Sequence, residues 1–241
     1  MWVETMPDVR RSTRNSESVD NYLKAILFLG GTEERRVTSS SLADRLEVAP
    51  ASVTNMLQKL AGAAEPMVEY ERHRGVKLSP TGKRRALEVV RHHRLIETFL
   101  FEILDYPIDE VHDEAERLEH FISERFEERI AAKLGYPTSD PHGHTIPTLS
   151  GEMQEPESIP LTDVAGEGSY LIASVSDEDG EKLRQLKTIG IAPGAFVHVK
   201  KRDAMAGYWL RVGHSLELVE LAPEIAREIR IAPEPQPDFP A

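Results

Sequence analysis

Residues 37–79, VTSSSLADRLEVAPASVTNMLQKLAGAAEPMVEYERHRGVKLS, decide the fold. Apolar side chains recur there at helical spacing in two short segments. These positions are Leu42, Ala43 and Leu46 in the first segment, and Val53, Met56, Leu57 and Leu60 in the second. Ser39 or Ser40 is placed to cap the first helix, and Pro50 suits the first turn of the second. Two short helices joined by a break such as EVAP predict a helix-turn-helix.

The same stretch ends in a predicted β-hairpin, with strands at 68–72 and 76–78 and a basic tip that includes Arg72 and Arg74. A hairpin directly after a helix-turn-helix is a wing, and cations at its tip can contact DNA phosphates. The outer face of the second helix carries small and amide side chains that fit a major groove, although short polar helices also cover many protein surfaces. The candidate DNA-binding residues are Ser39, Ala51, Ser52, Thr54, Asn55, Gln58, Lys59, Arg72 and Arg74.

A second informative stretch is VHDEAERLEH, residues 111–120. On a helix, four of its side chains fall within a sector of roughly 100° beside an apolar stripe. These four are His112, Glu116, Glu119 and His120. In RHHRLIETF, His93 and Glu97 repeat this pairing one helical turn apart. Two such helices can close on manganese, iron or zinc, but acidic residues with scattered histidines also form ordinary solvated faces. We expect the helix that carries this stretch to continue to about Leu134.

Composition narrows the classes of protein. The 241 residues include no cysteine, which excludes disulfides and thiolate metal sites. No apolar run is long enough to span a membrane or direct export, so a cytoplasmic location is expected. The net charge of −12 is unevenly distributed: residues 1–94 hold 16 Lys and Arg against 12 Asp and Glu, net +4, and the remainder is net −16. A basic front and an acidic back suit a DNA-binding domain joined to a cation-binding or partner-binding one.

The remaining segments complete the predicted organisation. The first helix is expected from Ser16, its N-cap, to Gly30, after an arm whose arginines could touch phosphate. Residues 136–160 are rich in Pro, Ser and Gly and predict a linker. Its HGH segment, with His142 and His144, could bind metal but is interpreted as a plain loop. Short β-like runs with one helix beyond residue 160 predict a compact barrel, followed by a disordered tail.

Seven stretches match a known family in the correct order: DNYLKAI, APASVTNMLQKL, RGVKLSPTGK, HHRLIETFL, VHDEAERLEH, PHGHTIP and LKTIGIAPG. Over nearly its whole length the chain resembles the metal-dependent transcriptional regulators typified by the diphtheria toxin repressor and the manganese transport regulator. The resemblance implies a mainly α fold with small β elements. The expected division is a winged helix-turn-helix over 1–80, a helical dimerisation and metal-binding domain over 81–140, a linker over 141–160, an SH3-like, FeoA-type barrel over 161–233 and a tail over 234–241.

The resemblance also implies metal ligands. His93, Glu97 and His112 are the expected ligands of one site; Glu116, Glu119 and His120 are those of a neighbouring site, to which the first helix contributes Asn21. In some family members the SH3-like module sends an acidic ligand to the first site, and here Asp179 is the nearest match.

Three positions depart from the family pattern. Glu116 stands where the iron-sensing branch has cysteine, and an additional hard oxygen favours Mn²⁺, with Fe²⁺ possible. Asn21 stands where the branches have Met or Asp; its amide oxygen is a weaker ligand than a carboxylate, and Asp20 is expected to point elsewhere. Lys24 stands where the manganese branch has Glu, which bears on the close metal pair of that branch.

The expected function is a manganese-activated repressor of metal uptake genes. It would act as a homodimer on a palindromic double-stranded DNA operator, with no membrane partner. The apolar residues expected to form the dimer interface are Phe99, Leu100, Ile103, Leu104 and Phe121. The alternatives are an iron(II)-responsive regulator of the same family and a winged-helix regulator that responds to a small organic ligand. No HExxH helix and no nucleophile with an attendant base is present, so an enzyme is not expected.

Overall fold

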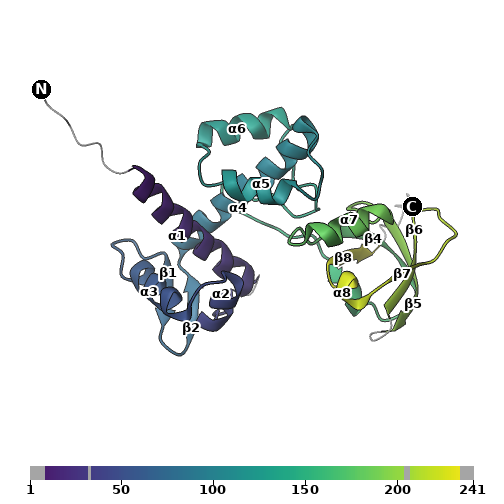
Figure 1. Ribbon diagram of the computed structural model, residues 1–241, viewed down its shortest axis with the longest axis horizontal. Helices are drawn as coiled ribbons and strands as arrows, with labels where there is room; N and C mark the ends of the chain where they lie inside the picture. The colour runs from purple at the N-terminus through teal and green to yellow at the C-terminus, as the bar shows by residue number, and fades with distance from the viewer. Residues whose placement is uncertain (1–8, 32–33, 204–206, 234–241) are drawn as a thin grey trace, which may run out of the picture. The chain divides into compact units, whose positions relative to one another are not determined.

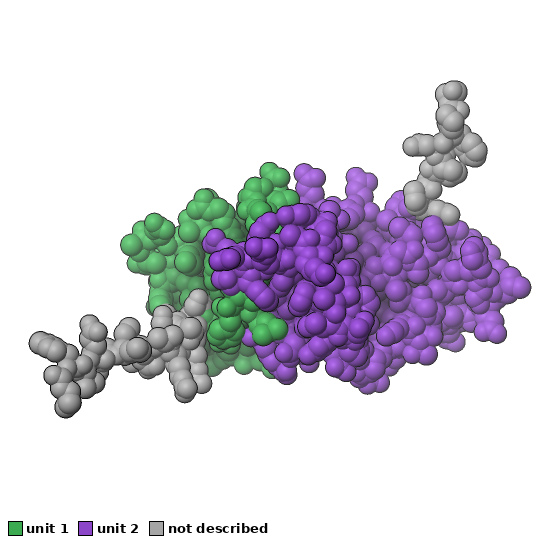
Figure 2. Space-filling view, turned by 90° about the horizontal axis from the view of Figure 1, so that it is seen from above, with its two compact units in different colours: residues 1–92, 118–122, 147–153 green, residues 93–117, 123–146, 154–241 purple. Residues whose placement is uncertain are grey.

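The computed structural model describes residues 9–31, 34–203 and 207–233 (Figure 1). The chain forms two compact units (Figure 2). Unit 1 comprises residues 1–92, 118–122 and 147–153, and unit 2 comprises residues 93–117, 123–146 and 154–241. The described part is mainly α-helical, with one two-stranded hairpin and one six-stranded C-terminal sheet, so the predicted fold class is confirmed.

Unit 1 contains a winged helix-turn-helix. Its elements are α1 (Val9–Gly30), α2 (Ser39–Arg45), α3 (Pro50–Ala61), β1 (Val68–Glu71), β2 (Gly75–Leu78) and the first part of α4 (Pro80–Leu104). The apolar positions that predicted the helices meet in one core, in which Leu23, Leu42 and Leu57 are fully buried. The helix period of the sequence therefore gave the correct inner faces, because each helix buries one apolar stripe.

The first helix is longer than predicted. α1 begins at Val9, so Ser16 lies inside the helix and is not its N-cap. The predicted arm covers residues 1–15, of which residues 9–15 are helical and residues 1–8 lie outside the described part. The same holds for the side chains of the arginines of this arm and for the predicted tail, residues 234–241.

The N-cap of α2 lies one residue earlier than predicted. Thr38 has extended backbone angles, and its Oγ1 accepts a hydrogen bond from the Ser41 amide at 3.1 Å. Ser39 and Ser40 are therefore helical residues rather than caps. Pro50 occupies the first turn of α3, as expected, where its missing N–H costs nothing.

The wing is an antiparallel pair in which Val68 faces Leu78 and Glu71 faces Gly75. Its second strand is also bonded to the segment before α2: the Val37 amide donates to the Val76 carbonyl at 2.7 Å, and the Val76 amide donates back at 2.9 Å. An isolated β-bridge between Val37 and Val76 therefore joins the wing to the segment before α2, and the wing is not a free hairpin.

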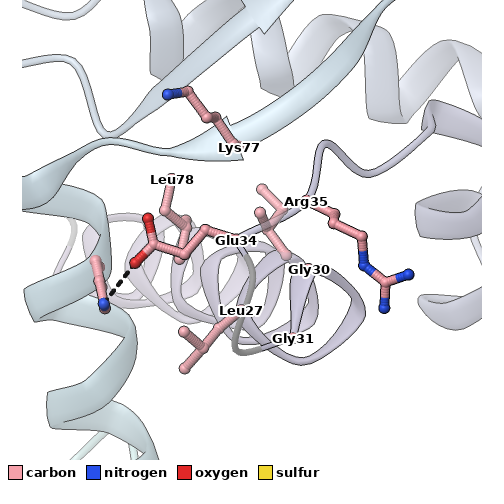
Figure 3. Close-up of a pocket in the computed structure, with 9 residues that line it drawn as sticks. Leu27, Gly30, Gly31, Glu34, Arg35, Lys77 and Leu78 are labelled. Carbon is pink, nitrogen blue, oxygen red and sulfur yellow. Dashed lines mark hydrogen bonds and ion pairs between the residues drawn. The ribbon is translucent and has the colours of Figure 1, made fainter.

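A shallow hollow lies where the end of α1 meets β2 and the start of α4 (Figure 3). Leu27, Gly30 and Leu78 line it, and Glu34 and Lys83 close one side with an ion pair of 2.6 Å. The ion pair joins the start of α4 to the segment that follows α1.

The single helix predicted from VHDEAERLEH to about Leu134 is interrupted. α5 (Val111–Leu118) ends before Glu119, and α6 (Glu124–Lys133) starts after a cap at Ser123, whose Oγ accepts from the Phe126 amide at 3.3 Å. The prediction of one helix to about Leu134 is wrong. The polar cap at Ser123 starts a new helix, and Glu119 and His120 lie in the turn between them.

The C-terminal part of unit 2 is a six-stranded sheet with the order β3-β8-β4-β5-β6-β7. The strands are β3 (Ile159–Pro160), β4 (Gly168–Val175), β5 (Phe196–Asp203), β6 (Gly207–Val212), β7 (Val219–Leu221) and β8 (Ile229–Pro233), with helices α7 (Gly180–Thr188) and α8 (Pro223–Ala226) and the short 3₁₀ turn η1 (Leu161–Asp163). Leu186 of α7 is buried in the core of this sheet with Ile172 and Ile231. Among the β-like runs beyond residue 160, SLELVEL (residues 215–221) is extended only at its end, and β8 was not predicted. No helix among the described residues is long and apolar enough to cross a membrane.

Gly75 is a position at which a side chain should disturb the wing. Its φ is +91°, and a Cβ there would lie 2.5 Å from the Val37 carbonyl oxygen. We expect Gly75→Ala to lower the free energy of unfolding by about 1–3 kcal/mol, because both strain and overlap must be relieved. Chemical denaturation measures this loss. Gly166→Ala, where a Cβ meets nothing within 4 Å, is the control, and equal stability of the two variants would contradict the expectation.

Candidate metal centre and DNA-binding face

The metal-binding candidates of unit 2 begin with a pair on α4. His93 and Glu97 are one turn apart, so their side chains share a face, and His93 Nε2 lies 3.0 Å from Glu97 Oε1. His112, near the start of α5, adds its Nδ1 at 3.2 Å from His93 Nε2 and 3.3 Å from Glu97 Oε1. The structure therefore brings together the three residues that the resemblance implied for one site.

The acidic residue from the C-terminal part of unit 2 is Asp177 and not Asp179. Asp177 Oδ2 lies 3.4 Å from His112 Nδ1. Asp179 caps α7 instead, where its Oδ1 accepts from the amides of Glu181 and Lys182 at 3.0 and 3.2 Å. One potential ligand atom from each of His93, Glu97, His112 and Asp177 lies within 4.8 Å of the others.

The segment PHGH, interpreted from the sequence as a plain loop, lies beside this cluster. Asp140 Oδ1 accepts hydrogen bonds from the amides of His142 and His144, both at 2.9 Å, which folds the segment into a tight loop. Gly143 has φ +87°, and a Cβ there would lie 2.2 Å from the carbonyl oxygen of Ala173 in β4. The loop is thus pressed against the sheet, and its histidines point inward.

Both histidines of the loop reach the cluster. His142 is fully buried, with its Nδ1 3.7 Å from Glu97 Oε1. His144 Nδ1 lies 3.4 Å from Asp140 Oδ2 and 3.6 Å from Asp177 Oδ2. Sequence reasoning missed Asp140 and Asp177 and set His142 and His144 aside. The usable signal was an aspartate two residues before a histidine pair.

Charged neighbours shift the pKa values of the buried groups in this cluster. Burial raises the pKa of Glu97, but His93, His112 and His142 outweigh it, so the net pKa is well below the ordinary value. Burial lowers the pKa of His112, but Asp177 and Glu97 raise it to about 10. Burial likewise raises the pKa of Asp177, but His112 and His144 lower it by more, so the net pKa is below the ordinary value. Protonated imidazole therefore compensates buried carboxylate.

The composition of the cluster fits a divalent cation. Glu97, Asp140 and Asp177 face one permanent cation, Arg94, whose Nε lies 3.6 Å from Asp140 Oδ2. With neutral histidines this leaves an excess of two negative charges, which a dication would balance. Among the described residues, Glu97 Oε2, Asp140 Oδ2 and His142 Nδ1 are buried without a hydrogen-bond partner. Such orphaned donors and acceptors need an explanation, and an ion is one.

The other implied ligands are divided between the two units. Glu119 and His120 belong to unit 1, where Glu119 Oε1 lies 2.7 Å from Lys24 Nζ and 3.3 Å from His120 Nε2. The amide oxygen of Asn21 is buried there without a hydrogen-bond partner among the described residues. Glu116 is half-buried on α5 in unit 2.

The expectation that Asp20 points elsewhere is wrong. Asp20 is buried, and its Oδ2 lies 3.4 Å from His120 Nδ1. Both of its oxygens also accept hydrogen bonds from Arg85 at 2.8 Å. Burial raises the pKa of Asp20, but contacts with His120 and Arg85 lower it more. Asp20 of α1 thus lies beside His120 in the turn after α5.

Most of the predicted DNA-binding residues are exposed in unit 1. Thr54 is half-buried on α3, with its hydroxyl donating to the Pro50 carbonyl at 3.2 Å, and Ser39 is half-buried on α2. The exposed members are Ala51, Ser52, Asn55, Gln58 and Lys59 on α3, and Arg72 and Arg74 at the tip of the wing. A cationic wing beside a helix with an amide-bearing face suits phosphate and base-edge contacts.

A winged helix-turn-helix and a buried cation-binding cluster in one chain define a metal-regulated DNA-binding protein. Three family models match the chain: the iron dependent repressor N-terminal DNA binding domain over residues 15–76, the iron dependent repressor metal binding and dimerisation domain over 79–148, and the FeoA domain over 159–233. The chain belongs to the diphtheria toxin repressor family of metal-dependent DNA-binding repressors, which are not enzymes.

Relatives of this chain include both iron-dependent and manganese-dependent proteins. The iron-dependent repressor IdeR of Mycobacterium leprae is 30% identical over 230 residues, which cover 89% of this chain and 96% of the relative. The diphtheria toxin repressor of Corynebacterium diphtheriae is 29% identical over 227 residues, with the same two coverages. The solved structure of a manganese-dependent transcriptional repressor in complex with manganese is 35% identical, with a TM-score of 0.82 over 90% of this chain and 100% of that one. These matches support a divalent metal without selecting one.

Cation binding at the unit 2 cluster should release protons. Near pH 7 His112 is protonated, since its pKa is about 10, whereas a metal ligand must be the neutral imidazole. Manganese affinity should therefore increase as pH rises toward that pKa and decrease as pH falls. Titration calorimetry in buffers of different ionisation enthalpy should find about one proton or more released per ion near pH 7. Binding without proton release would contradict the assignment of His112.

The PHGH loop offers a separate test. We expect His142→Ala to weaken manganese binding about tenfold or more, because His142 is a buried donor beside Glu97. The exposed His214 supplies the matched control, His214→Ala, which should bind as the parent does. If both variants bind manganese equally well, the loop is not part of the site.

Proposed function

We propose that this protein is a manganese-activated repressor of metal uptake genes, acting as a homodimer on a palindromic operator. The observation that carries the choice of metal is the donor set of unit 2. His93, Glu97, His112 and Asp177 offer only nitrogen and oxygen atoms, and the chain has no sulfur ligand of the thiolate type. Such donors suit Mn²⁺, and they leave Fe²⁺ as the alternative.

The division of labour follows the domains expected from the sequence. We propose that residues 1–80 bind DNA, that residues 81–140 dimerise and bind metal together with the 140–144 loop, and that residues 161–233 supply Asp177. In a dimer the two α3 helices would enter major grooves about 34–36 Å apart, one turn of DNA. Asn55 and Gln58 would read base edges, and Arg72 and Arg74 would contact phosphates.

The dimer interface needs exposed apolar surface. In unit 2 the end of α4 offers Phe101, Ile103 and Leu104, which are 39%, 39% and 50% exposed, and α6 offers Phe126. Leu100, one of the residues expected there, is buried and therefore unavailable. Exposed aromatic and aliphatic side chains at this density favour burial against a second copy.

The link between cation and DNA runs through elements that belong to both functions. α4 carries His93 beside His92, whose Nδ1 lies 3.2 Å from the Glu119 carbonyl oxygen in unit 1. α1, which shares a core with Val76 of the wing, reaches the same turn through Lys24 and Asp20. A bound cation would supply two positive charges to carboxylates that otherwise depend on protonated histidines. Conversion from mostly inactive to mostly active requires about 5 kcal/mol of differential binding.

DNA binding to the protein's own promoter, titrated with Mn²⁺ and with Fe²⁺, tests this function. We expect Mn²⁺ to strengthen binding at least about tenfold, and Glu97→Gln to remove this effect because it deletes the central carboxylate. Glu65→Gln, at an exposed position, is the matched control. Stripped protein that binds the promoter as tightly as the loaded form would contradict the function, and a response to Fe²⁺ at lower concentration than Mn²⁺ would overturn the choice of metal alone.

A further inference from the structure

The acidic pocket of unit 1 already contains a cation, the ammonium of Lys24. Its Nζ lies 2.7 Å from Glu119 Oε1; the Glu119 side chain is fully buried and that of Lys24 is 13% exposed. The same Glu119 oxygen lies 3.3 Å from His120 Nε2. Two donors suited to a metal, the carboxylate of Glu119 and the imidazole of His120, therefore lie together where the ammonium of Lys24 binds.

The charges of this pocket differ from those of the unit 2 cluster. Asp20 is held by Arg85 through two hydrogen bonds of 2.8 Å, and Arg85 also bonds the partly exposed Glu88. Glu119 is held by Lys24. The two buried carboxylates of the unit 1 pocket, Asp20 and Glu119, thus face two permanent cations. The unit 2 cluster, in contrast, has two more negative charges than positive ones. A dication entering the unit 1 pocket would leave it with excess positive charge unless one cation left.

Lys24 is the cation that can leave. Arg85 is fixed by a bidentate contact, a geometry that gains from both hydrogen bonds. Lys24 binds Glu119 through one ammonium–oxygen pair at the end of a flexible stem, and its partial exposure lets the ammonium move toward water while the stem stays packed. Expulsion of Lys24 would open Glu119 and His120 to an ion.

We propose that Lys24 sets the cation affinity of the unit 1 pocket, because a divalent ion must displace its ammonium from Glu119. This inference rests on the proposed function and adds to it an order of filling. The unit 2 cluster binds first, since its carboxylates outnumber the permanent cation that faces them. The unit 1 pocket, which includes α1 of the DNA-binding region, fills only at higher cation concentration, so Lys24 determines the concentration at which the protein responds.

Manganese titrations of the full-length chain test the role of Lys24, with free Mn²⁺ followed by electron paramagnetic resonance and bound ions counted by native mass spectrometry. The wild-type chain should bind one ion tightly and another more weakly. Lys24→Met should bind the second ion at least tenfold more tightly and leave the first unchanged. Lys24→Gln, which keeps a polar side chain, guards against misfolding. Lys83→Met removes a comparable ion pair, 2.6 Å from Glu34, and should change neither ion.

Two results would overturn the proposal: a second affinity that is unchanged or weaker in both Lys24 variants, or a single ion in the wild type and both variants. Thermal unfolding of the metal-free chain tests independently whether Lys24 neutralises Glu119. Lys24→Met should melt at lower temperature than the wild type and recover more on addition of Mn²⁺, because Glu119 loses its ammonium. Equal melting without metal also overturns it. Failure of the wild type to bind any ion would overturn the proposed function, whereas the melting comparison would still decide whether Lys24 neutralises Glu119.

Discussion

The buried carboxylate of Glu97 is the constraint on which the metal-binding region depends. It has no exposed surface, and an isolated charge in that position would cost several kcal/mol. His93, His112 and His142 offset this cost, each with a ring nitrogen 3.0–3.7 Å from Glu97 Oε1. They come from α4, α5 and the loop after α6, so the packing of these segments is tied to the charge of a single side chain.

That constraint also explains how distant parts of unit 2 are held. Asp177, between β4 and α7, lies within 3.4 Å of His112 and 3.6 Å of His144. Arg94, one residue after His93, donates to the Thr145 carbonyl and lies beside Asp140. The sheet and the helices are therefore joined through a polar cluster and not through apolar contacts alone. Such a cluster is stable only when its charges and polar groups are fully compensated.

Periodicity and spacing predicted the elements whose environment is local. The inner face of α3, the wing and the pair His93 and Glu97 all follow from positions within one element. The sequence did not distinguish Asp177 from Asp179, because both lie in SDEDGEKL and only the start of α7 decides which one becomes a cap. It also did not predict the break after Leu118, since the continuing helical pattern concealed the cap at Ser123.

The inward packing of the PHGH loop was not predicted for a related reason. Pro and Gly are common in plain linkers, and composition alone does not reveal that Asp140 folds the loop inward by accepting two amide hydrogen bonds. The position of Asp20 was likewise hidden, because a helical projection of α1 does not include Arg85 and His120, which draw it into the pocket. In each case a long-range polar contact overrode the local pattern.

The central claim is that a divalent cation binds among Glu97, His112 and Asp177. X-ray diffraction from crystals grown with Mn²⁺, recorded near the manganese absorption edge, tests it most directly. We expect an anomalous peak in contact with the Glu97 carboxylate, with His112 and Asp177 as further ligands. Anomalous density elsewhere on the chain, with none at Glu97 in the presence of excess Mn²⁺, would contradict it.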